Sequence, residues 1–594
     1  MNAAGGAFDA FRTFPEMLGY VARNYENPAA LNAKTDEGWQ PISTRELVGQ
    51  VCRLALALKT AGVSKGDTVA LLAVPGPYWL IADLSILMLG AVSIPLFPTD
   101  PPDTVRFKLE DAGVRHMFLF EQAAWPAVEK SAGSLATIFT HGFDVPHKGN
   151  RRCEELSESR SASEEDATGL LVNWSDAVTE HDLATIIYTS GSTGVPKGVE
   201  LTHGNLITQV HAARQSYPLE PGRRALSCLP LAHSFERMIV YFYLAYGISV
   251  YFNRAITELG EDLRAVQPSL MTVVPRILEK LQAKFIHGIE ENTGLKRRIG
   301  RWALARANAR EPEAGTPGLA DRLADRLVYA KFRQALGGQL YYVITGGAAT
   351  GPPLYRFLVN VGIPLYQGYG LTEASPVLTA NRPSANRIGT VGTAFPGVTV
   401  KLTDDGEIIG RGPNIMRGYH NRPEETAKTI DADGWLHTGD SGELDADGFL
   451  TITGRIKELL KTSCGEYVAP APIEQALVAH PLVDMAMILG EGRKFVSCLL
   501  FPDLTGVAHM KEEHDCTAMS DEEFLRSPAV DAAITALLET VNATLEHWEQ
   551  IRKYRFVLSA PSVAGGELTQ TMKLRRHIIT EKHLDLIDEM YRED

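Results

Sequence analysis

The sequence predicts an α/β protein with a large N-terminal domain and a small, mobile α+β C-terminal domain. A chain of 594 residues is too long for one hydrophobic core, so two or more domains are expected. Apolar strands such as 69–72 alternate with helical patterns such as 44–61, an order typical of layered, doubly wound α/β domains. After Arg455 the pattern changes to a smaller unit that ends in charged helices. We therefore expect two domains, 1–454 and 455–594.

Composition and charge argue against several classes of protein. The chain has 72 acidic and 58 basic residues, and this excess of negative charge makes nucleic acid an unlikely main partner. Six cysteines without a Cys-x-x-Cys pair argue against a disulfide framework and a structural zinc site, and fit a reducing, cytoplasmic setting. Residues 1–14 lack the basic and apolar segments of a secretory signal. The apolar stretch 79–98 contains Asp83, Gly90 and Pro95, so we predict a buried helix running into a strand and not a membrane span.

A loop rich in glycine, serine and threonine follows the apolar run 184–188. Its glycines let the backbone approach an anion, its hydroxyls add neutral donors, and Lys197 supplies a mobile positive charge. Because Lys197 stands between Pro196 and Gly198, the loop is not a Walker A motif. A flexible linker is the plainer alternative, but linkers rarely join two strand-like runs. The predicted phosphate-binding residues are Thr189, Ser190, Gly191, Ser192, Thr193, Gly194 and Lys197.

Other segments are assigned from their local patterns. Residues 157–168 are polar and aperiodic, which predicts an exposed loop. Strand-like 340–345 and 363–366 each end in a glycine-rich turn, the place where open α/β sheets bind ligands. Glycines and short β runs over 389–443 predict a β-rich subdomain.

The pattern over 277–310 is helical and strongly basic. A basic helix can contact an anionic membrane surface, here at the inner face of a membrane, but such a charge run is more often a solvated helix face. Both interpretations stay open. The basic residues are Lys296, Arg297, Arg298, Arg301 and Arg306.

The loop Thr-Ser-Gly-Ser-Thr-Gly-Val-Pro-Lys-Gly-Val, residues 189–199, resembles the signature of the adenylate-forming enzymes, which include acyl-CoA synthetases. Residues 229–237 and 273–280 are similar to motifs of the long-chain fatty acyl branch. This resemblance implies an ATP-dependent ligase that activates a medium-to-long-chain fatty acid as acyl-AMP and transfers the acyl group to CoA. It implies ATP, Mg²⁺ and CoA as ligands. The alternatives are an acyl-AMP ligase that delivers to a carrier protein or another acceptor, and a catalytically silent nucleotide-binding protein.

The resemblance also implies roles for residues around the nucleotide. The signature loop would handle the outer phosphates of ATP, and Tyr369 would lie against adenine. Thr372 would contact the α-phosphate, and Glu373 would help to hold Mg²⁺. Lys573, in a loop at 566–576, matches the adenylation lysine. An ammonium group there would bridge the two anions that approach one another during adenylation.

Further positions complete the predicted site. By the resemblance, Asp440 accepts hydrogen bonds from the ribose hydroxyls and Arg455 approaches them from the other side. Gly347 and Ala348 line the floor between adenine and the acyl chain. His233 shapes the carboxylate end of the acyl pocket, and the aromatic run behind it, 238–252, is core and pocket wall together.

The C-terminal part of the chain is expected to serve the second half of the reaction. The resemblance places a hinge near Lys457. It places Lys461 and Gly465 on a loop that borders the CoA channel. Cys464, in the same loop, stands where the family usually has a small residue, and we interpret it as a small hydrophobic side chain.

Overall fold

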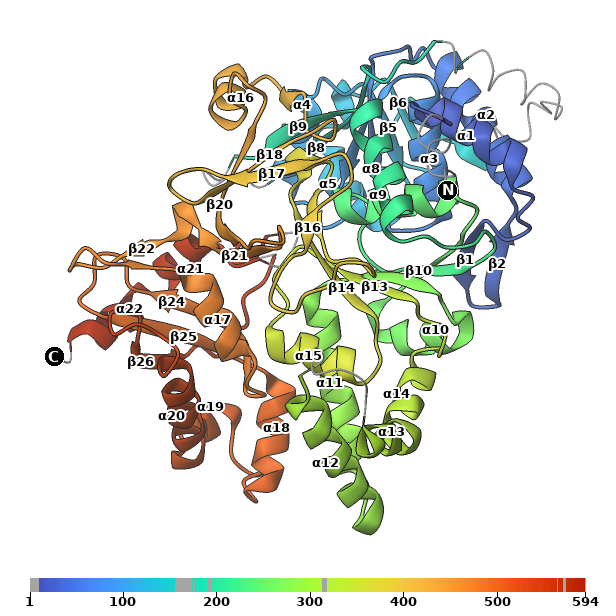
Figure 1. The fold of residues 1–594 in the computed structure, drawn as a ribbon. Helices are drawn as coiled ribbons and strands as arrows, with labels where there is room; N and C mark the ends of the chain where they lie inside the picture. The colour runs from blue at the N-terminus through green and yellow to red at the C-terminus, as the bar shows by residue number, and fades with distance from the viewer. Residues whose placement is uncertain are drawn as a thin grey trace. The chain divides into compact units, whose positions relative to one another are not determined.

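The computed structural model describes residues 10–154, 174, 177–189, 195–311, 318–563, 565–569 and 573–592. The chain divides into two compact units. The N-terminal unit consists of 1–401, 409–438 and 444–451, and the C-terminal unit consists of 402–408, 439–443 and 452–594. Figure 1 shows the helices and strands along the chain, and each unit is described by itself below.

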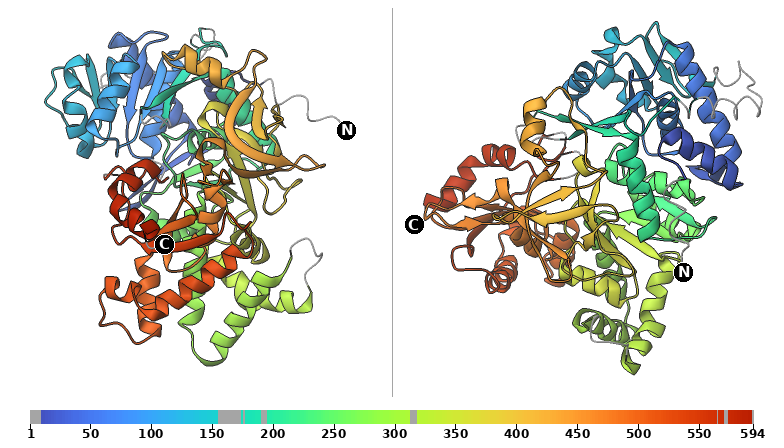
Figure 2. Two further views of the ribbon diagram at one scale, coloured as in Figure 1. Left: turned by 90° about the vertical axis from the view of Figure 1, so that its left-hand side faces the viewer. Right: turned by 45° about the horizontal axis from the view of Figure 1, so that its top comes forward.

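An eight-stranded sheet occupies the first part of the N-terminal unit, in the order β19-β9-β8-β4-β3-β5-β6-β7. Its strands from β8 to β7 are parallel, and β9 pairs antiparallel with β8. Figure 2 shows the blue strands of this sheet with blue and cyan helices packed against them. The strands are β3 (Thr68–Leu72), β4 (Val92–Leu96), β5 (His116–Leu119), β6 (Thr137–Thr140), β7 (Asn150–Arg152), β8 (Leu183–Thr189), β9 (Lys197–Thr202) and β19 (Gly418–Tyr419).

A nine-stranded sheet follows, in the order β16-β15-β14-β13-β12-β10-β11-β1-β2. Its central strands, from β1 to β14, are parallel, and the pairs at both edges are antiparallel. The strands are β1 (Leu31–Thr35), β2 (Gly38–Ile42), β10 (Arg224–Ser227), β11 (Ser249–Phe252), β12 (Leu270–Val273), β13 (Tyr342–Thr345), β14 (Leu365–Gly370), β15 (Val377–Ala380) and β16 (Thr393–Ala394). Two parallel sheets with helical crossovers confirm the predicted α/β class.

Helices cover the faces of these sheets. One continuous core includes side chains from both sheets and from α3, α8 and α9. The helices are α1 (Phe14–Asn24), α2 (Thr44–Thr60), α3 (Pro77–Met88), α4 (Pro102–Asp111), α5 (Trp125–Glu129), α8 (His203–Ser216), α9 (Ser234–Ala245), α10 (Leu259–Val266), α11 (Pro275–Glu290), α12 (Gly294–Ala309), α13 (Leu319–Ala324), α14 (Ala330–Ala335), α15 (Pro352–Asn360) and α16 (Pro423–Thr429), with a π-helical turn (Asp325–Tyr329) between α13 and α14.

Local sequence explains where helix α2 begins. Helix α2 starts at a capping box in which Ser43 and Glu46 each bind the other's backbone N–H, which accounts for the predicted helix 44–61. The apolar stretch 79–98 forms α3 and β4, as predicted. No helix among the described residues is long and apolar enough to cross a membrane.

The helical pattern predicted over 277–310 is formed by two helices, α11 and α12, which are separated by a turn after Glu290. The backbone of Gly294, the first residue of α12, has a φ of +58°, a left-handed value that does not continue the helical geometry of α11. The loop predicted at 157–168 lies outside the described residues.

A four-stranded sheet, β17-β18-β20-β21, carries the β-rich pattern of 389–443, and the division between the two units runs through it. The later C-terminal strands form a hairpin, β22-β23, and a three-stranded sheet, β24-β25-β26. The strands are β17 (Thr399–Leu402), β18 (Glu407–Arg411), β20 (Leu436–Leu444), β21 (Leu450–Arg455), β22 (Leu460–Lys461), β23 (Tyr467–Val468), β24 (Val483–Leu489), β25 (Val496–Pro502) and β26 (Ile551–Phe556).

The three-stranded sheet has a core on each face. Because side chains alternate along a strand, Ile488 and Cys498 enter one core while Met487 and Leu499 enter the other. Helices α17 and α20 contribute to the first core, and α21 and α22 to the second. The helices are α17 (Pro470–Val478), α18 (Leu504–Glu513), α19 (Asp521–Leu525), α20 (Pro528–Asn542), α21 (Arg576–Lys582) and α22 (Leu584–Arg592).

Candidate active site

The predicted phosphate-binding loop connects two antiparallel strands. Thr189 ends β8 and Lys197 begins β9, and the two residues are partners in the strand register. The predicted loop residues between them, Ser190, Gly191, Ser192, Thr193 and Gly194, lie outside the described residues. The hairpin therefore holds the two described ends of the loop together at one edge of the eight-stranded sheet.

Lys197 and the predicted metal-binding acid belong to one polar cluster. The Lys197 ammonium forms an ion pair with Glu425 on α16 and lies 5.2 Å from the centre of the Tyr419 ring. The Tyr419 hydroxyl donates a hydrogen bond of 2.8 Å to Oε1 of Glu373. The ion pair with Lys197 lowers the pKa of Glu425, and burial together with Glu373 raises the pKa of Tyr419. Tyr419 therefore connects the loop lysine to Glu373, and neither Tyr419 nor Glu425 was predicted from the sequence.

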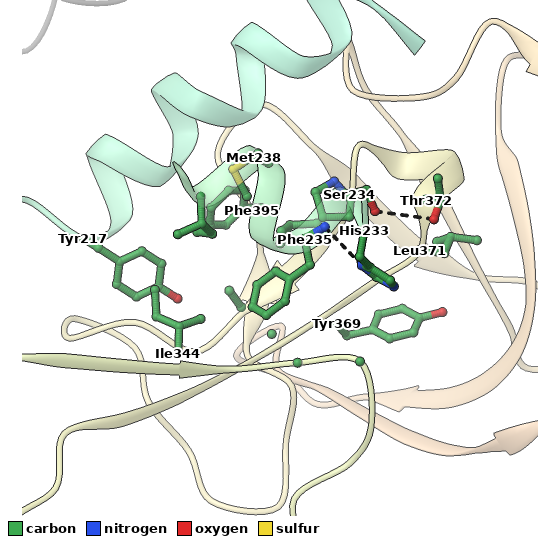
Figure 3. Close-up of a pocket in the computed structure, with 18 residues that line it drawn as sticks. Tyr217, His233, Ser234, Phe235, Met238, Ile344, Tyr369, Leu371, Thr372 and Phe395 are labelled. Atoms are coloured by element: carbon green, nitrogen blue, oxygen red, sulfur yellow. Dashed lines mark hydrogen bonds between the residues drawn. The ribbon is translucent and has the colours of Figure 1, made fainter. Parts of the chain in front are cut away.

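A pocket in the N-terminal unit has one polar and one apolar end (Figure 3). It contains about 550 Å³ of empty space, part of it open to solvent. Figure 3 shows Tyr217 and Ile344 at one end, and His233, Ser234 and Thr372 at the other. Residues at the apolar end and along the wall include Tyr217, Met238, Ile239, Ile344 and Phe395, and residues toward the polar end include His233, Ser234, Tyr369 and Thr372.

Helix α9 places the polar end of the pocket. His233 is its N-cap, and the Phe235 backbone N–H donates to His233 Nδ1 over 3.3 Å. The hydroxyls of Ser234 and Thr372 are 3.4 Å apart, and both residues are buried. An imidazole, two hydroxyls and the N-terminus of a helix are groups that can bind a carboxylate or phosphate oxygen.

The turn after β14 fixes the position of Thr372. A Cβ atom on Gly370 would lie 1.8 Å from the carbonyl oxygen of Pro376, so only glycine fits there. Tyr369 lines the pocket from the same strand. Gly347 also lines the pocket, and Ala348 follows it as an exposed residue beyond β13.

A buried charge cluster anchors α9. Arg237 is 1% exposed and forms an ion pair with Asp83 of α3, which is fully buried. Its Nη1 donates to the Thr185 hydroxyl of β8 over 2.8 Å, and its Nε donates to the Tyr241 hydroxyl over 2.7 Å. In the sequence alone, Asp83 indicates only that the apolar stretch 79–98 is not a membrane span. A carboxylate within an apolar helix needs a partner when it is buried, and that signal could have identified the pair.

Glu236 is the second buried charge-bearing group of α9. Its carboxylate accepts hydrogen bonds from the hydroxyls of Ser227 and Thr272. Burial nevertheless raises the pKa of Glu236 to about 7. Ser227 and Thr272 belong to β10 and β12 of the nine-stranded sheet, and Arg237 binds Thr185 of the eight-stranded sheet, so α9 is tied to both sheets next to the pocket.

Three predicted site residues come together in the C-terminal unit. Arg455 Nε donates to Asp440 Oδ1 over 3.0 Å. Enclosure by protein atoms and the charge of Arg455 lower the pKa of Lys573, whereas the charges of Asp440 and Glu458 raise it. Part of the Lys573 side chain stays exposed to solvent. The lysine therefore lies within electrostatic range of the Asp440–Arg455 pair.

The remaining predicted residues of this unit lie on two short elements. Lys457 belongs to a 3-10 turn, Ile456–Glu458, that follows β21. The β22-β23 hairpin carries Lys461, whose ammonium is 5.4 Å from the centre of the Tyr467 ring. Gly465 has a φ of +92° in the turn of this hairpin, where a side chain would strain the backbone, and Cys464 is exposed beside it.

Comparison with known proteins gives a consistent result. The family described as AMP-binding enzyme matches residues 20–420, and the AMP-binding enzyme C-terminal domain matches residues 457–594. The long-chain-fatty-acid–CoA ligase FadD15 of Mycobacterium bovis is 34% identical over 572 residues, 94% of each chain. The long-chain-fatty-acid–CoA ligase ACSBG2 of Gallus gallus is 30% identical, over 100% of this chain and 83% of its own.

Solved structures share the fold. The adenylation domain of a carboxylate reductase from Mycobacterium chelonae has a TM-score of 0.74 at 20% identity, covering 98% of this chain and 91% of that domain. The anthranilate CoA ligase AuaEII, solved with anthranoyl-AMP, has a TM-score of 0.73 at 19% identity, covering 96% of this chain and 98% of its own.

Proposed function

This chain belongs to the AMP-binding enzymes, and on that premise we propose that it is an AMP-forming fatty acid:CoA ligase. The substrate class is a medium-to-long-chain fatty acid. The observation that carries the proposal is the pocket, whose apolar end is lined by Tyr217 and Ile344 and whose polar end is lined by His233, Ser234 and Thr372. The names of the relatives FadD15 and ACSBG2, both long-chain-fatty-acid–CoA ligases, support the same substrate class.

In the first half-reaction, a fatty acid carboxylate oxygen attacks the α-phosphorus of ATP. The bond from this phosphorus to the pyrophosphate oxygen breaks, and acyl-AMP and pyrophosphate result. We assign Lys197 and its loop to the outer phosphates, Thr372 to the α-phosphate, and Tyr369, Gly347 and Ala348 to the adenine and the floor beneath it. Asp440 and Arg455 bind the ribose, and Lys573 stabilises the charge that develops during attack.

In the second half-reaction, the CoA thiol attacks the acyl carbonyl carbon after losing its proton. The bond between this carbon and the AMP oxygen breaks, which gives the thioester and AMP. We assign Lys461 and Gly465 to the border of the CoA channel, and Lys457 to a hinge between residues 1–454 and 455–594. Proline at Lys457 would fix φ and is expected to stop thioester formation while acyl-AMP still forms. Normal CoA transfer in Lys457→Pro would refute the hinge.

The residues around Glu373 fit a magnesium ion held jointly with ATP. Among the described residues, no group of three His, Cys, Asp or Glu side chains could hold a metal by itself. The Glu373 carboxylate lies in the same cluster as Lys197, so it would share an ion with phosphate oxygens. When bound, Mg²⁺ screens the negative charge of the phosphates, and the protein residues position the reacting groups.

The reaction is tested by measuring the two half-reactions separately. ATP–pyrophosphate exchange that depends on dodecanoate, followed by AMP release that depends on CoA, is the expected result. Exchange without CoA-dependent AMP release would identify the alternative acyl-AMP ligase. No exchange with any carboxylic acid would identify a silent nucleotide-binding protein.

Chain length tests the assignment of the pocket. Each buried methylene contributes about 0.8 kcal/mol, so kcat/KM should rise several-fold per added methylene until the pocket is full. Acetate serves as the control acid. Higher kcat/KM for acetate than for dodecanoate would contradict a fatty acid pocket.

We also propose that the protein works in the cytoplasm, with peripheral contact at the inner face of a membrane. Support comes from the sequence, in which the six cysteines form no Cys-x-x-Cys pair, and from the basic residues of α12.

A further inference from the structure

The backbone on the two sides of the loop that carries Lys573 is joined by hydrogen bonds. The Thr569 N–H donates to the carbonyl oxygen of Lys573 over 2.8 Å, and the Lys573 N–H donates to the Thr569 hydroxyl over 3.0 Å. One step further out, the Arg575 N–H donates to the carbonyl oxygen of Glu567 over 2.7 Å. The backbone of Lys573 is therefore held at the end of a short ladder, although its side chain is exposed.

Glu567, at the base of this ladder, is a buried acid with a cationic partner. Its Oε1 forms an ion pair with Lys582, the last residue of α21. Its Oε2 accepts hydrogen bonds from the backbone N–H and the hydroxyl of Ser562, over 3.2 and 3.4 Å. The hydrogen-bonded ion pair with Lys582 lowers the pKa of Glu567, so the acid is charged at neutral pH. A buried charge is stable only with such partners.

Arg576, the first residue of α21, forms a second ion pair on the other side of Lys573 in the sequence. Its Nη2 donates to both carboxylate oxygens of Glu474 on α17, over 2.6 Å each. Its Nη1 donates to the carbonyl oxygen of Ile488 in β24 over 3.2 Å, and the Ile488 N–H donates to Glu474 over 2.7 Å. Charge-assisted hydrogen bonds of this length are stronger than neutral ones, so they fix the start of α21 to α17 and β24.

The two ion pairs stand at opposite ends of one short helix. We call Glu567, Lys582, Glu474 and Arg576 the α21 brace. Between the two pairs, Ile579 of α21 is fully buried in the second core of the C-terminal sheet. A helix of seven residues is not stable by itself, so the brace and this core determine its position. Both sides of the lysine loop are consequently fixed to the same helix.

The position of the Lys573 ammonium depends on the backbone that carries it. Among the residues that the structure describes, only electrostatic interactions with Arg455, Asp440 and Glu458 reach this side chain, and none of them is a hydrogen bond. A lysine side chain is long and flexible, and a misplacement of about 1 Å at a reacting centre can cost about 10²-fold in rate. Precise placement of Lys573 therefore requires a rigid loop.

We propose that the α21 brace positions Lys573 for acyl-AMP formation. The four brace residues are positioning residues, because each acts through the loop and none is assigned to a substrate. The inference rests on the proposed function, which gives Lys573 its role in adenylation. Loosening either ion pair should move the ammonium away from the place where charge develops during attack on the α-phosphorus.

Half-reaction rates of the full-length protein test the brace. Glu567→Gln and Glu474→Gln keep the shape of the side chain and each removes the charge of one ion pair. Each should lower the rate of acyl-AMP formation from dodecanoate about tenfold, while thioester formation from supplied acyl-AMP stays at the wild-type rate. Lys582→Gln breaks the first pair at a partly exposed position, where folding is not at risk, and should reproduce the loss seen in Glu567→Gln. Wild-type adenylation in these variants, or equal losses in both half-reactions, would overturn the proposal.

A double-mutant cycle separates positioning from general destabilisation. If Glu567 acts through Lys573, adding Glu567→Gln to Lys573→Ala should lower the adenylation rate by less than about twofold further. A further loss of about tenfold would contradict the brace. Asp521→Asn is the matched control, because it removes the charge from the 2.9 Å ion pair between Asp521 and Lys511 in the same unit. This control should keep the wild-type rates of both half-reactions.

Amide hydrogen exchange gives a measurement that does not require ligase activity. The N–H groups of Lys573 and Arg575 should exchange about tenfold faster in Glu567→Gln and Glu474→Gln than in the wild type or in Asp521→Asn. Unchanged protection in the brace variants would overturn the proposal. If the wild type shows no ATP–pyrophosphate exchange with any carboxylic acid while the brace variants lose protection, the brace still orders the loop and the proposed function fails.

Discussion

Helices α9 and α13 both place arginine beside large apolar side chains, but one is buried and the other is exposed. Arg237 of α9 is 1% exposed and is bound by Asp83, Thr185 and Tyr241. Arg322 of α13 is exposed and has no such partners among the described residues. The comparison teaches that burial and not residue type decides what a charged side chain does. A buried, satisfied charge fixes the position of a helix, whereas an exposed charge remains available to a ligand.

The largest expected effect is on stability. Arg237→Leu leaves the Asp83 carboxylate buried without its partner, and we expect a loss of about 3–5 kcal/mol in the free energy of unfolding. Arg297→Leu, on exposed α12, is the matched control and should cost about 0–1 kcal/mol, because Glu290 keeps Arg301. Denaturant titration of both variants measures the difference. Losses of similar size would show that burial does not distinguish the two helices.

A pH titration of stability tests the same contrast for carboxylates. In the folded protein the pKa of Glu236 is raised to about 7, so between pH 4.5 and 7 the unfolded chain releases this proton and the folded chain keeps it. The free energy of unfolding of the wild type should therefore fall by about 3 kcal/mol relative to that of Glu236→Gln as the pH rises from 4.5 to 7. Above pH 7 the difference between the two proteins should stay constant. The half-buried Glu290 should show the opposite sign, with its stabilising contribution lost as the pH falls from about 4.5 toward 2. Parallel pH profiles for wild type and Glu236→Gln would contradict the buried-acid interpretation.

The variant Lys573→Ala tests whether an exposed cation stabilises the charge that develops on the substrates during acyl-AMP formation. Lys573→Ala should lower the rate of acyl-AMP formation about 10²-fold, roughly 3 kcal/mol in transition-state stabilisation. Thioester formation from supplied acyl-AMP should be unchanged, and so should the midpoint of thermal unfolding. Lys494→Ala, an exposed lysine of the same unit, is the control. Equal losses in both half-reactions would remove Lys573 from its assigned role.

The smallest expected effect concerns the ion pair between Lys197 and Glu425. Glu425→Gln removes the carboxylate that engages the loop lysine, so the ammonium should be freer to bind phosphate. We expect the KM for ATP to fall two- to fivefold, which corresponds to less than about 1 kcal/mol in binding free energy. The free energy of unfolding should not change. Glu425→Asp is the control that keeps the charge. A rise in the KM for ATP in Glu425→Gln would mean instead that Glu425 orients Lys197 for binding.

Local patterns in the sequence predicted the fold class and most of the individual elements. Helix α2 and strand β3 match the helical pattern at 44–61 and the apolar strand at 69–72 that were predicted. The helical pattern over 277–310 did not locate the break between α11 and α12, which lies at residues 291–293.

The predicted site residues were found through family resemblance. The residues that form ion pairs and hydrogen bonds with them or with the helices that carry them were not predicted. Asp83 and Arg237 are 154 positions apart, and Lys197 and Glu425 are 228 apart. No local period connects residues at such distances, because the sheets bring them together only in the folded chain. His233 as the N-cap of α9 was also missed, since Ser, Thr, Asp and Asn are the usual residues there.

The double-faced sheet of the C-terminal unit has a consequence for the energy of domain motion. Helices α17 and α20 cover one face of β24-β25-β26, and α21 and α22 cover the other. Both cores are therefore closed within the unit, and their burial does not depend on its orientation. If the chain turns at Lys457 as proposed, the rotation exposes neither of these cores to water, so modest differences in ligand contacts are sufficient to favour one orientation over another.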